Sequence, residues 1–252
     1  MTARPCFRSS APRWADLLNP GDAIFCAVDT TDLTRAAALA DSVAGTVGGL
    51  KLGLEFFAAH GPSGVAEISR RGGKLFLDLK LHDIPNTVAA AVRACLPLRP
   101  HLLTVHAGGG PAMLRAAAEA AAEAGAERPR IIAVTILTSL DDDDLDRVGQ
   151  RGPALDQARR LAALARESGA DGVVCSAHEA AALRAECGAG FDLVVPGIRP
   201  AGVAAGDQKR VMTPAQARAA GADYLVIGRA ITAAPDPAAA ARAIVAEMTA
   251  NP

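Results

Sequence analysis

A regular alternation of short apolar segments with longer alanine-rich segments runs through most of the 252 residues and constrains the fold more than any other feature. Short apolar runs bounded by turn residues predict buried strands, and alanine-rich stretches predict helices. The predicted strands are residues 23–28, 47–53, 74–80, 101–106, 130–137, 171–175, 192–196 and 223–227. The predicted helices are residues 32–44, 55–70, 86–97, 111–125, 154–168, 177–187, 213–220 and 236–249. Eight strands that alternate singly with eight helices favour a parallel β/α barrel, and an open doubly wound sheet is the alternative.

The first residues of the chain differ in composition from the rest. Residues 1–11 are rich in Ser, Pro and Arg and are expected to be a disordered leader. Residues 12–19 predict a short helix that could plug the bottom of the barrel. No linker divides the remaining chain, and a β/α barrel of about 250 residues is one domain. We therefore expect an α/β protein in which residues 12–252 form a single (β/α)8 TIM barrel with a short N-terminal helix.

The charge and cysteine content exclude several classes of protein. The 26 basic and 27 acidic residues give a net charge of −1, which supplies no electrostatic reason to expect nucleic acid or an anionic membrane surface as a partner. The five cysteines are odd in number and have no metal-like spacing, and Cys26 and Cys175 lie in apolar strands. Since no apolar run approaches the length of a membrane span and no signal-peptide core is present, we expect a cytoplasmic protein with reduced, buried thiols.

Lysine is rare in this chain. Only four of the 26 basic residues are lysine, namely Lys51, Lys74, Lys80 and Lys209. Arginine cannot give up its proton in a protein, whereas lysine can. Two of the four, Lys51 and Lys80, fall at the far ends of predicted strands. At that position the ability of lysine to give up its proton is expected to be used in a site.

The segment KLFLDLKLHDIPNT, residues 74–87, places ionisable groups at the end of an apolar strand. Strand alternation puts Phe76, Asp78 and Lys80 on one face and three leucines on the other. Asp83 follows closely, and Pro85 predicts the first turn of a helix. The alternative is a surface ion pair between Asp78 and Lys80, with Asp83 as a helix N-cap, which for Asp83 alone is the stronger interpretation.

Other strand ends carry polar residues of the same kind. In a β/α barrel the active site lies at the carboxyl ends of the strands and in the loops that follow them. The candidates at these positions are Asp29, Lys51, Asp78, Lys80, His106, Thr135, Thr138, Arg199, Gly228 and Arg229. Two acids and two lysines therefore gather on one face, where alternating charges keep each other ionised. No histidine has a partner at metal-ligand spacing, and His106 is expected to be a packed or hydrogen-bonded core histidine rather than a ligand.

The loops after the last two strands predict an anion site, because barrels commonly bind phosphate there. Gly228 permits close approach of the backbone, Arg229 can form a forked contact with a phosphate, and Arg199 is a second candidate. The segment 199–213 is long and contains small residues, which is typical of a lid, although it could be a plain surface connection. The acidic run 141–144 is expected to be a solvated turn before a helix.

Several of these motifs occur together, in order, in a known family. They are AVDT, KLG, FLDLKLHDIPNT, PGIRP, GDQ and VIGRAI, and they span the chain from about Asp22 to Met248. In this set and order they resemble the orotidine 5′-phosphate decarboxylase family, in its bacterial type. The DLKxHDIPNT signature is specific, whereas other barrels of the same superfamily share only DxKxxD.

The resemblance implies an enzyme, a carboxy-lyase that converts orotidine 5′-phosphate to uridine 5′-phosphate in the last step of de novo pyrimidine biosynthesis. It implies no metal and no organic cofactor. Lys80 would be the proton donor, and Lys51, Asp78 and Asp83 would complete the charged set around the reacting carbon. It also implies a homodimer in which Asp83 and Thr87 reach into the neighbouring site.

The resemblance further implies which residues contact the substrate. The expected contacts are Asp29, Lys51, Asp78, Ile84, Thr87, Thr138, Arg199, Gln208, Gly228 and Arg229. Asp29 and Lys51 would bind ribose hydroxyls, and Thr138 would contact the pyrimidine. The phosphate would be held by Gln208, Gly228 and Arg229, with Arg199 at the edge.

The chemistry agrees with this set, because loss of CO2 leaves a carbanion in the plane of the ring with no π system to receive the electron pair. Preorganised charges must then lower the barrier. One alternative is a sugar-phosphate decarboxylase or aldolase-like synthase, which uses DxKxxD with a divalent metal and carries an acid near the position of Lys51. Another is a non-catalytic phosphate-binding barrel, which would have no need of the whole Asp–Lys–Asp set.

Overall fold

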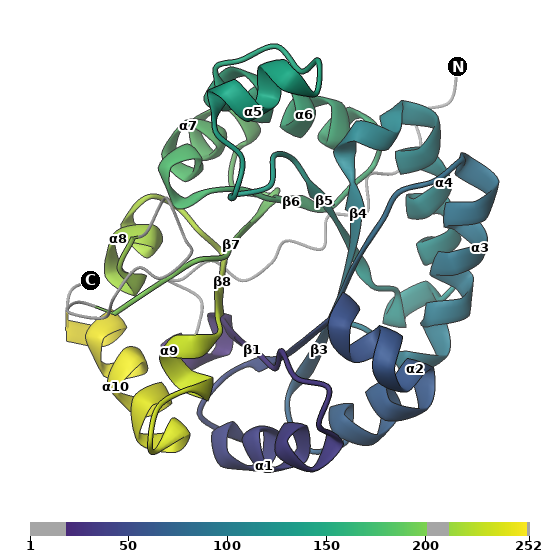
Figure 1. The fold of residues 1–252 in the computed structure, drawn as a ribbon. Helices are drawn as coiled ribbons and strands as arrows, with labels where there is room; N and C mark the ends of the chain where they lie inside the picture. Colours follow the sequence, from purple (N-terminus) through teal and green to yellow (C-terminus); the bar gives the residue numbers. More distant parts are fainter. Residues whose placement is uncertain (1–18, 201–211, 251–252) are drawn as a thin grey trace.

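The computed structural model describes residues 19–200 and 212–250, and the described residues form a closed barrel of eight parallel strands in sequential order (Figure 1). The strands are β1 (Ile24–Ala27), β2 (Gly49–Gly53), β3 (Lys74–Leu81), β4 (Leu102–His106), β5 (Arg130–Val134), β6 (Gly172–Val174), β7 (Asp192–Val195) and β8 (Tyr224–Ile227). The pairing of β1 with β8 closes the barrel. The predicted β/α barrel is therefore confirmed, and the open sheet is excluded.

The strands are apolar on both faces because both faces are buried, as parallel sheets require. Inside the barrel, Phe25 and Phe76 pack edge to face with ring centroids 5.5 Å apart, and Tyr224 packs on Phe25 in the same way. The leucines that alternate with Phe76 on β3 belong to the larger outer core beneath the helices. The predicted division of β3 into two faces is confirmed.

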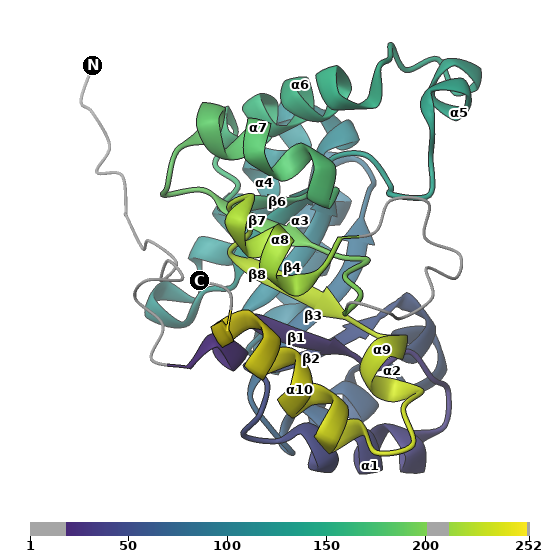
Figure 2. The same cartoon turned by 90° about the vertical axis from the view of Figure 1, so that its left-hand side faces the viewer.

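Helices surround the barrel, as Figures 1 and 2 show. The longer ones are α1 (Leu33–Val43), α2 (Leu54–Ser69), α3 (Pro85–Cys95), α4 (Gly110–Ala122), α6 (Ala154–Glu167), α7 (Ala177–Cys187) and α10 (Pro237–Ala250). Shorter ones are α5 (Asp142–Arg147), α8 (Pro214–Ala219) and α9 (Arg229–Thr232), with 3-10 turns η2 (Pro20–Ala23), η3 (Leu96–Leu98), η4 (Ala107–Gly109) and η5 (Gly125–Glu127). Many of their buried residues are alanine, whose small side chain lets a helix approach the sheet closely.

Two local predictions were wrong. The acidic run 141–144 is not a plain turn, because Asp141 and Asp144 exchange side-chain-to-backbone hydrogen bonds in a capping box that starts α5. Strand β5 ends at Val134 rather than at residue 137, since the three-residue β6 pairs with it only as far as Val134. The expected leader and the helix at 12–19 lie largely outside the described residues, which begin at Asn19.

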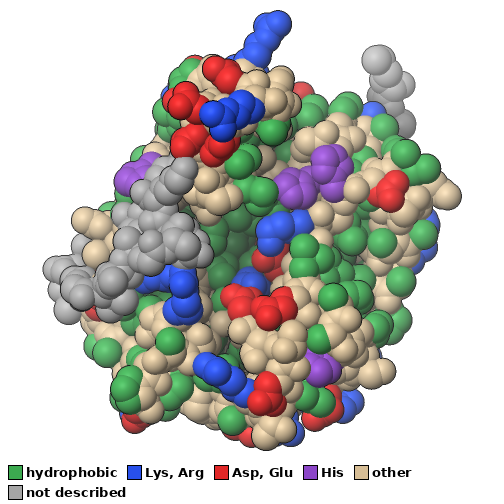
Figure 3. Space-filling view, viewed as in Figure 1, with side chains coloured by type: hydrophobic (Ala, Val, Ile, Leu, Met, Phe, Trp, Pro, Cys, Tyr) green, Lys and Arg blue, Asp and Glu red, His purple; other side chains and the backbone are tan. Residues whose placement is uncertain are grey.

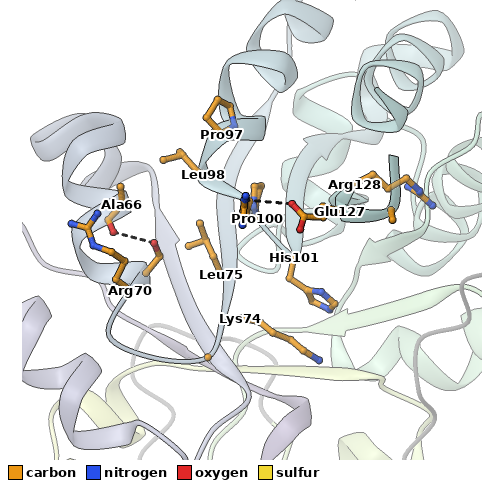
Figure 4. Close-up of a pocket in the computed structure, with 14 residues that line it drawn as sticks. Ala66, Arg70, Lys74, Leu75, Pro97, Leu98, Pro100, His101, Glu127 and Arg128 are labelled. Carbon is orange, nitrogen blue, oxygen red and sulfur yellow. Dashed lines mark hydrogen bonds and ion pairs between the residues drawn. The ribbon is translucent and has the colours of Figure 1, made fainter. Parts of the chain in front are cut away.

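Buried ion pairs close the end of the barrel where the strands begin. Arg130 on β5 binds Asp192 on β7, and Arg184 on α7 binds Asp223 just before β8. A cavity of about 570 Å³ lies at this end between α2, η3 and η5, and Figure 4 shows the residues that line it, among them His101. Residues at this face of a barrel usually serve stability, and active sites lie at the opposite end.

Cys26 and Cys175 are buried free thiols, as predicted, and burial raises the pKa of Cys26 to about 12. In the described part of the chain, no helix combines the length and the apolar character that a membrane crossing requires.

Candidate active site

A pocket of about 430 Å³ opens at the carboxyl ends of the strands. Figure 3 shows this face, with acidic and basic side chains gathered around a hollow in its middle. The pocket is lined by Ala27, Asp29, Lys51, Phe76, Asp78, Lys80, Val134, Ile136, Leu137, Thr138, Val174, Val194, Pro196, Gly197, Arg199, Val226, Gly228, Arg229 and Thr232. Eight of the twelve site residues that the resemblance implies are on this wall.

Four of them form a row of alternating charge across β1, β2 and β3. The Lys51 ammonium lies 2.9 Å from Asp29 Oδ1 and 3.8 Å from Asp78 Oδ2. The Lys80 ammonium lies 2.7 Å from the same oxygen of Asp78. Lys51 and Asp78 are each only 8% exposed. Every charge in the row therefore has an opposite neighbour, which offsets the cost of shielding it partly from water.

Strand β3 is irregular where it carries the pair Asp78 and Lys80. Its pairing with β4 runs regularly to Leu77 opposite Leu103 and resumes with Leu81 opposite Val105. Three residues of β3 therefore face the single residue Thr104. The backbone of Lys80 takes the left-handed conformation with φ +49°, which is uncommon for a residue other than glycine. Both side chains line the pocket.

The Thr104 side chain lies against both ends of the bulge. Its hydroxyl accepts a hydrogen bond from the Lys80 backbone N–H and donates one to Asp78 Oδ1, both at 2.9 Å. Sequence reasoning missed this residue. A signal was present, since Thr104 is the only polar side chain in the apolar run 102–105 and shares the inward face of Leu102.

The far side of the pocket carries two cations. Arg199 is 7% exposed, and burial together with the Arg229 guanidinium lowers its pKa. Gly228 precedes α9, and a Cβ at this position would come within 3.5 Å of Ala27 Cβ. A buried arginine whose charge is opposed by a second guanidinium is suited to bind an anion, which would relieve the repulsion.

Thr138 lies half-buried on the pocket wall in the loop after β5, beside Leu137 and Ile136. The neighbouring Thr135 is buried but does not line the pocket, and its hydroxyl donates to the Val174 carbonyl at 2.9 Å. The wall between the two charged regions is otherwise largely apolar, which suits a planar ring with few polar contacts.

The structure does not bring three predicted residues to this pocket. Asp83, Ile84 and Thr87 are exposed on the segment between β3 and α3, and Ile84 is 67% exposed. Asp83 is not the N-cap of α3, because that position is Ile84 without a side-chain cap bond, and Asp83 instead accepts from the Ile84 N–H. Gln208 and most of the expected lid lie outside the described residues.

His106 is half-buried at the end of β4, with its ring centroid 5.3 Å from that of the exposed His82. Burial and then the neighbouring His82 lower the pKa of His106. Within residues 19–200 and 212–250, no three His, Cys, Asp or Glu side chains are grouped as metal ligands would be.

Comparison with known proteins gives the family of the chain. Residues 22–244 match the model of the orotidine 5′-phosphate decarboxylase / HUMPS family. The chain belongs to this family. Among its curated relatives, the orotidine 5′-phosphate decarboxylase of Paramagnetospirillum magneticum is 56% identical over 92% of this chain and 99% of its own length. That of Rhodospirillum rubrum is 60% identical over 89% and 93%.

A solved member of the family has the same fold. The crystal structure of orotidine 5′-phosphate decarboxylase from Lactobacillus acidophilus superposes with a TM-score of 0.79 at 38% sequence identity, covering 89% of this chain and 98% of that one. The resemblance drawn from the sequence motifs is therefore confirmed at the level of family and fold.

Proposed function

We propose that this protein decarboxylates orotidine 5′-phosphate to uridine 5′-phosphate, the activity for which its relatives are named and a step of pyrimidine biosynthesis. The observation that carries the proposal is the row Asp29–Lys51–Asp78–Lys80 at one side of a pocket whose other side holds Arg199 and Arg229. A reacting ring can lie against the first group while its phosphate contacts the second.

Lys80 is the proposed proton donor. Its ammonium lies at the end of the charged row and is partly exposed to the pocket, so it can approach the carbon that loses CO2. Asp78 would lie against the departing carboxylate and favour its loss. As the electron pair develops on carbon, Lys80 balances the charge and then delivers its proton, while the Lys51 ammonium remains beside Asp78.

The remaining contacts hold the substrate. Asp29 and Lys51 would bind the ribose hydroxyls, and Thr138 would contact the pyrimidine. The phosphate would lie against Gly228 and Arg229. Arg199 at the edge and Gln208 from the segment 199–213 would complete this contact, and the binding energy of the distant phosphate would help to form the reactive arrangement.

A second copy of the chain would complete the site. Asp83, Ile84 and Thr87 do not line the pocket of their own chain, yet they directly follow the strand that carries Lys80. Ile84 is 67% exposed, so its apolar side chain is available for contact with a second copy. We place these three residues in the neighbouring site of a cytoplasmic homodimer.

The reaction is proposed to need no metal and no organic cofactor. Related barrels that use a divalent metal carry an acid near the position of Lys51, whereas here a lysine occupies it and pairs with Asp29 and Asp78. Decarboxylation can be followed by the loss of orotidine 5′-phosphate absorbance, with and without prior exhaustive chelation. We expect equal rates. Loss of turnover on chelation with recovery on adding Mg²⁺ would favour the metal-dependent sugar-phosphate chemistry instead.

A further inference from the structure

We infer that the Thr104 hydroxyl is a positioning group for the reaction, because it holds Asp78 and Lys80 in the bulge that brings their side chains together. The inference rests on the proposed function in so far as it concerns turnover. Thr104 does not line the pocket, so it would act through its two neighbours and not on the substrate.

The first observation is that one hydroxyl serves both residues. A threonine hydroxyl has one proton to donate, and here that proton goes to Asp78 Oδ1 at 2.9 Å. The oxygen also accepts from the Lys80 N–H at 2.9 Å. Asp78 is then held at both oxygens, since Oδ2 contacts the Lys80 ammonium. The carboxylate therefore has little freedom to rotate.

The second observation is the backbone conformation. In a regular parallel pair the Lys80 N–H would donate to a carbonyl of β4, but the break in register between Leu77 and Leu81 removes that arrangement. The left-handed conformation of Lys80 persists only if its surroundings over-determine it. The Thr104 oxygen supplies the acceptor, and Thr104 is fully buried, so water does not substitute for it.

The decisive comparison replaces Thr104 by valine, which keeps the shape and removes the hydroxyl, and by serine, which keeps the hydroxyl. We expect Thr104→Val to lower kcat about 10- to 100-fold, since a displacement of about 1 Å at reacting groups has effects of this size. The KM for orotidine 5′-phosphate and the Kd for uridine 5′-phosphate should change by less than about threefold, because the phosphate and ribose contacts remain. Thr104→Ser should restore kcat to within about threefold of wild type.

Thr135→Val is the matched control. It also removes a buried hydroxyl that donates to a partner on a neighbouring strand, but that partner is the backbone carbonyl of Val174 and neither of the charged residues Asp78 and Lys80. Its kcat should stay near the wild-type value even if its thermal midpoint falls as far as that of Thr104→Val. A kcat that tracks the loss of thermal stability in both variants would overturn the inference.

Two further arms keep the test decisive. If Thr104→Val does not fold, serine is compared with cysteine, which has a similar size but a weak donor and acceptor, and equal kcat values for the two would reject the inference. Crystal structures of the variants test the positioning apart from turnover. Lys80 should leave the left-handed region and its ammonium should separate from Asp78 in the variant without a hydroxyl, but not in the serine variant.

The outcomes for function and for positioning are separable. A wild-type protein that does not consume orotidine 5′-phosphate would refute the proposed function, and the crystal structures would still decide what Thr104 holds. An active wild-type protein whose Thr104→Val variant turns over at nearly the same rate, or keeps Lys80 in place, would refute the positioning role alone.

Discussion

Lys80 differs from the other lysines of the chain in its environment. Its side chain is 30% exposed, touches Asp78 at 2.7 Å and extends from a left-handed backbone position. Lys74, at the other end of the same strand, is exposed. The two residues share one strand and one side-chain type, so they allow the chemistry of lysine to be separated from its charge.

We predict that Lys80→Arg folds and binds uridine 5′-phosphate but loses turnover by at least about a thousandfold, near the upper range for acid–base groups. Guanidinium is a far weaker acid than ammonium, and its planar fork does not fit the place of a point charge. Single-turnover decarboxylation measures the effect, and Lys74→Arg serves as the control that should stay near wild type. An Lys80→Arg protein that retained a tenth of wild-type turnover would remove Lys80 from the role of acid.

The sequence was sufficient to predict residues that carry a charge at a strand end. Asp29, Lys51, Asp78 and Lys80 were all predicted, and the structure places them in one row. Thr104 was not predicted, because its role depends on the bulge opposite it. Strand alternation alone gives the face of a residue but not the break in register that lets one hydroxyl reach two residues.

At the scale of elements, the two ends of the strands have different roles. The carboxyl ends supply the pocket, while the amino ends carry buried ion pairs and His101. The His101 ring stacks beside Phe25 and lies 3.2 Å from the Tyr224 hydroxyl. Burial, and to a lesser extent Lys74 and Arg130, lower the pKa of His101 to about 4. A histidine held neutral in this way makes stability depend on pH.

The folded protein should lose stability as the pH falls from about 6.5 toward 4, because the unfolded histidine binds a proton in this window and the folded one does not. Between pH 7 and pH 5 this group should lower the free energy of unfolding by about 2 kcal/mol. In urea unfolding, the free energy of unfolding of His101→Gln should fall between pH 7 and pH 5 by about 2 kcal/mol less than that of wild type. The exposed His178 gives the control, His178→Gln. A His101→Gln protein with the same pH dependence as wild type would contradict the prediction.

The order and type of the elements were predictable because buried strands and alanine-rich helices have distinct periodicities. The residues at which the elements end were less predictable. β5 stops early because its neighbour β6 has three residues, and α5 forms because a capping box satisfies its first turn. Both causes are contacts between residues that sequence periodicity does not reveal, although the acids at 141 and 144 have the capping-box spacing.

At the scale of the whole molecule, three of the expected site residues do not line the pocket of their own chain. The acid Asp83, which the resemblance places in the neighbouring site, lies on the exposed segment that follows β3 and does not line the pocket of its own chain. If a second copy supplies this acid, the two halves of each site can be disabled independently. That possibility gives the homodimer a test in terms of activity.

We predict that a mixture of Lys80→Ala and Asp83→Ala proteins regains activity that neither has alone. Each hybrid dimer would have one site with both residues intact, so equal amounts with free exchange should give about a quarter of wild-type turnover. The control mixes Lys80→Ala with Asp78→Ala. These residues touch within one chain, so no intact site can form and no activity should return. Absence of recovery in the first mixture, after subunit exchange is verified, would count against a shared site.

The bulge in β3 has a consequence for protein engineering. In an extended strand two residues advance by about 6.6 Å, so an Asp-x-Lys written into a regular barrel strand would have its lysine reach back along the strand instead of out toward a ligand. In β3 the rise along the strand is smaller, because three residues lie opposite the single residue Thr104 of β4. Transfer of the Asp-x-Lys motif alone into another barrel would therefore not reproduce the positions of the two side chains. The transferred segment would also need the extra residues that form the bulge. In addition, the neighbouring strand of the recipient barrel would need a residue with a hydroxyl group, in the place of Thr104, to hydrogen-bond to the bulge.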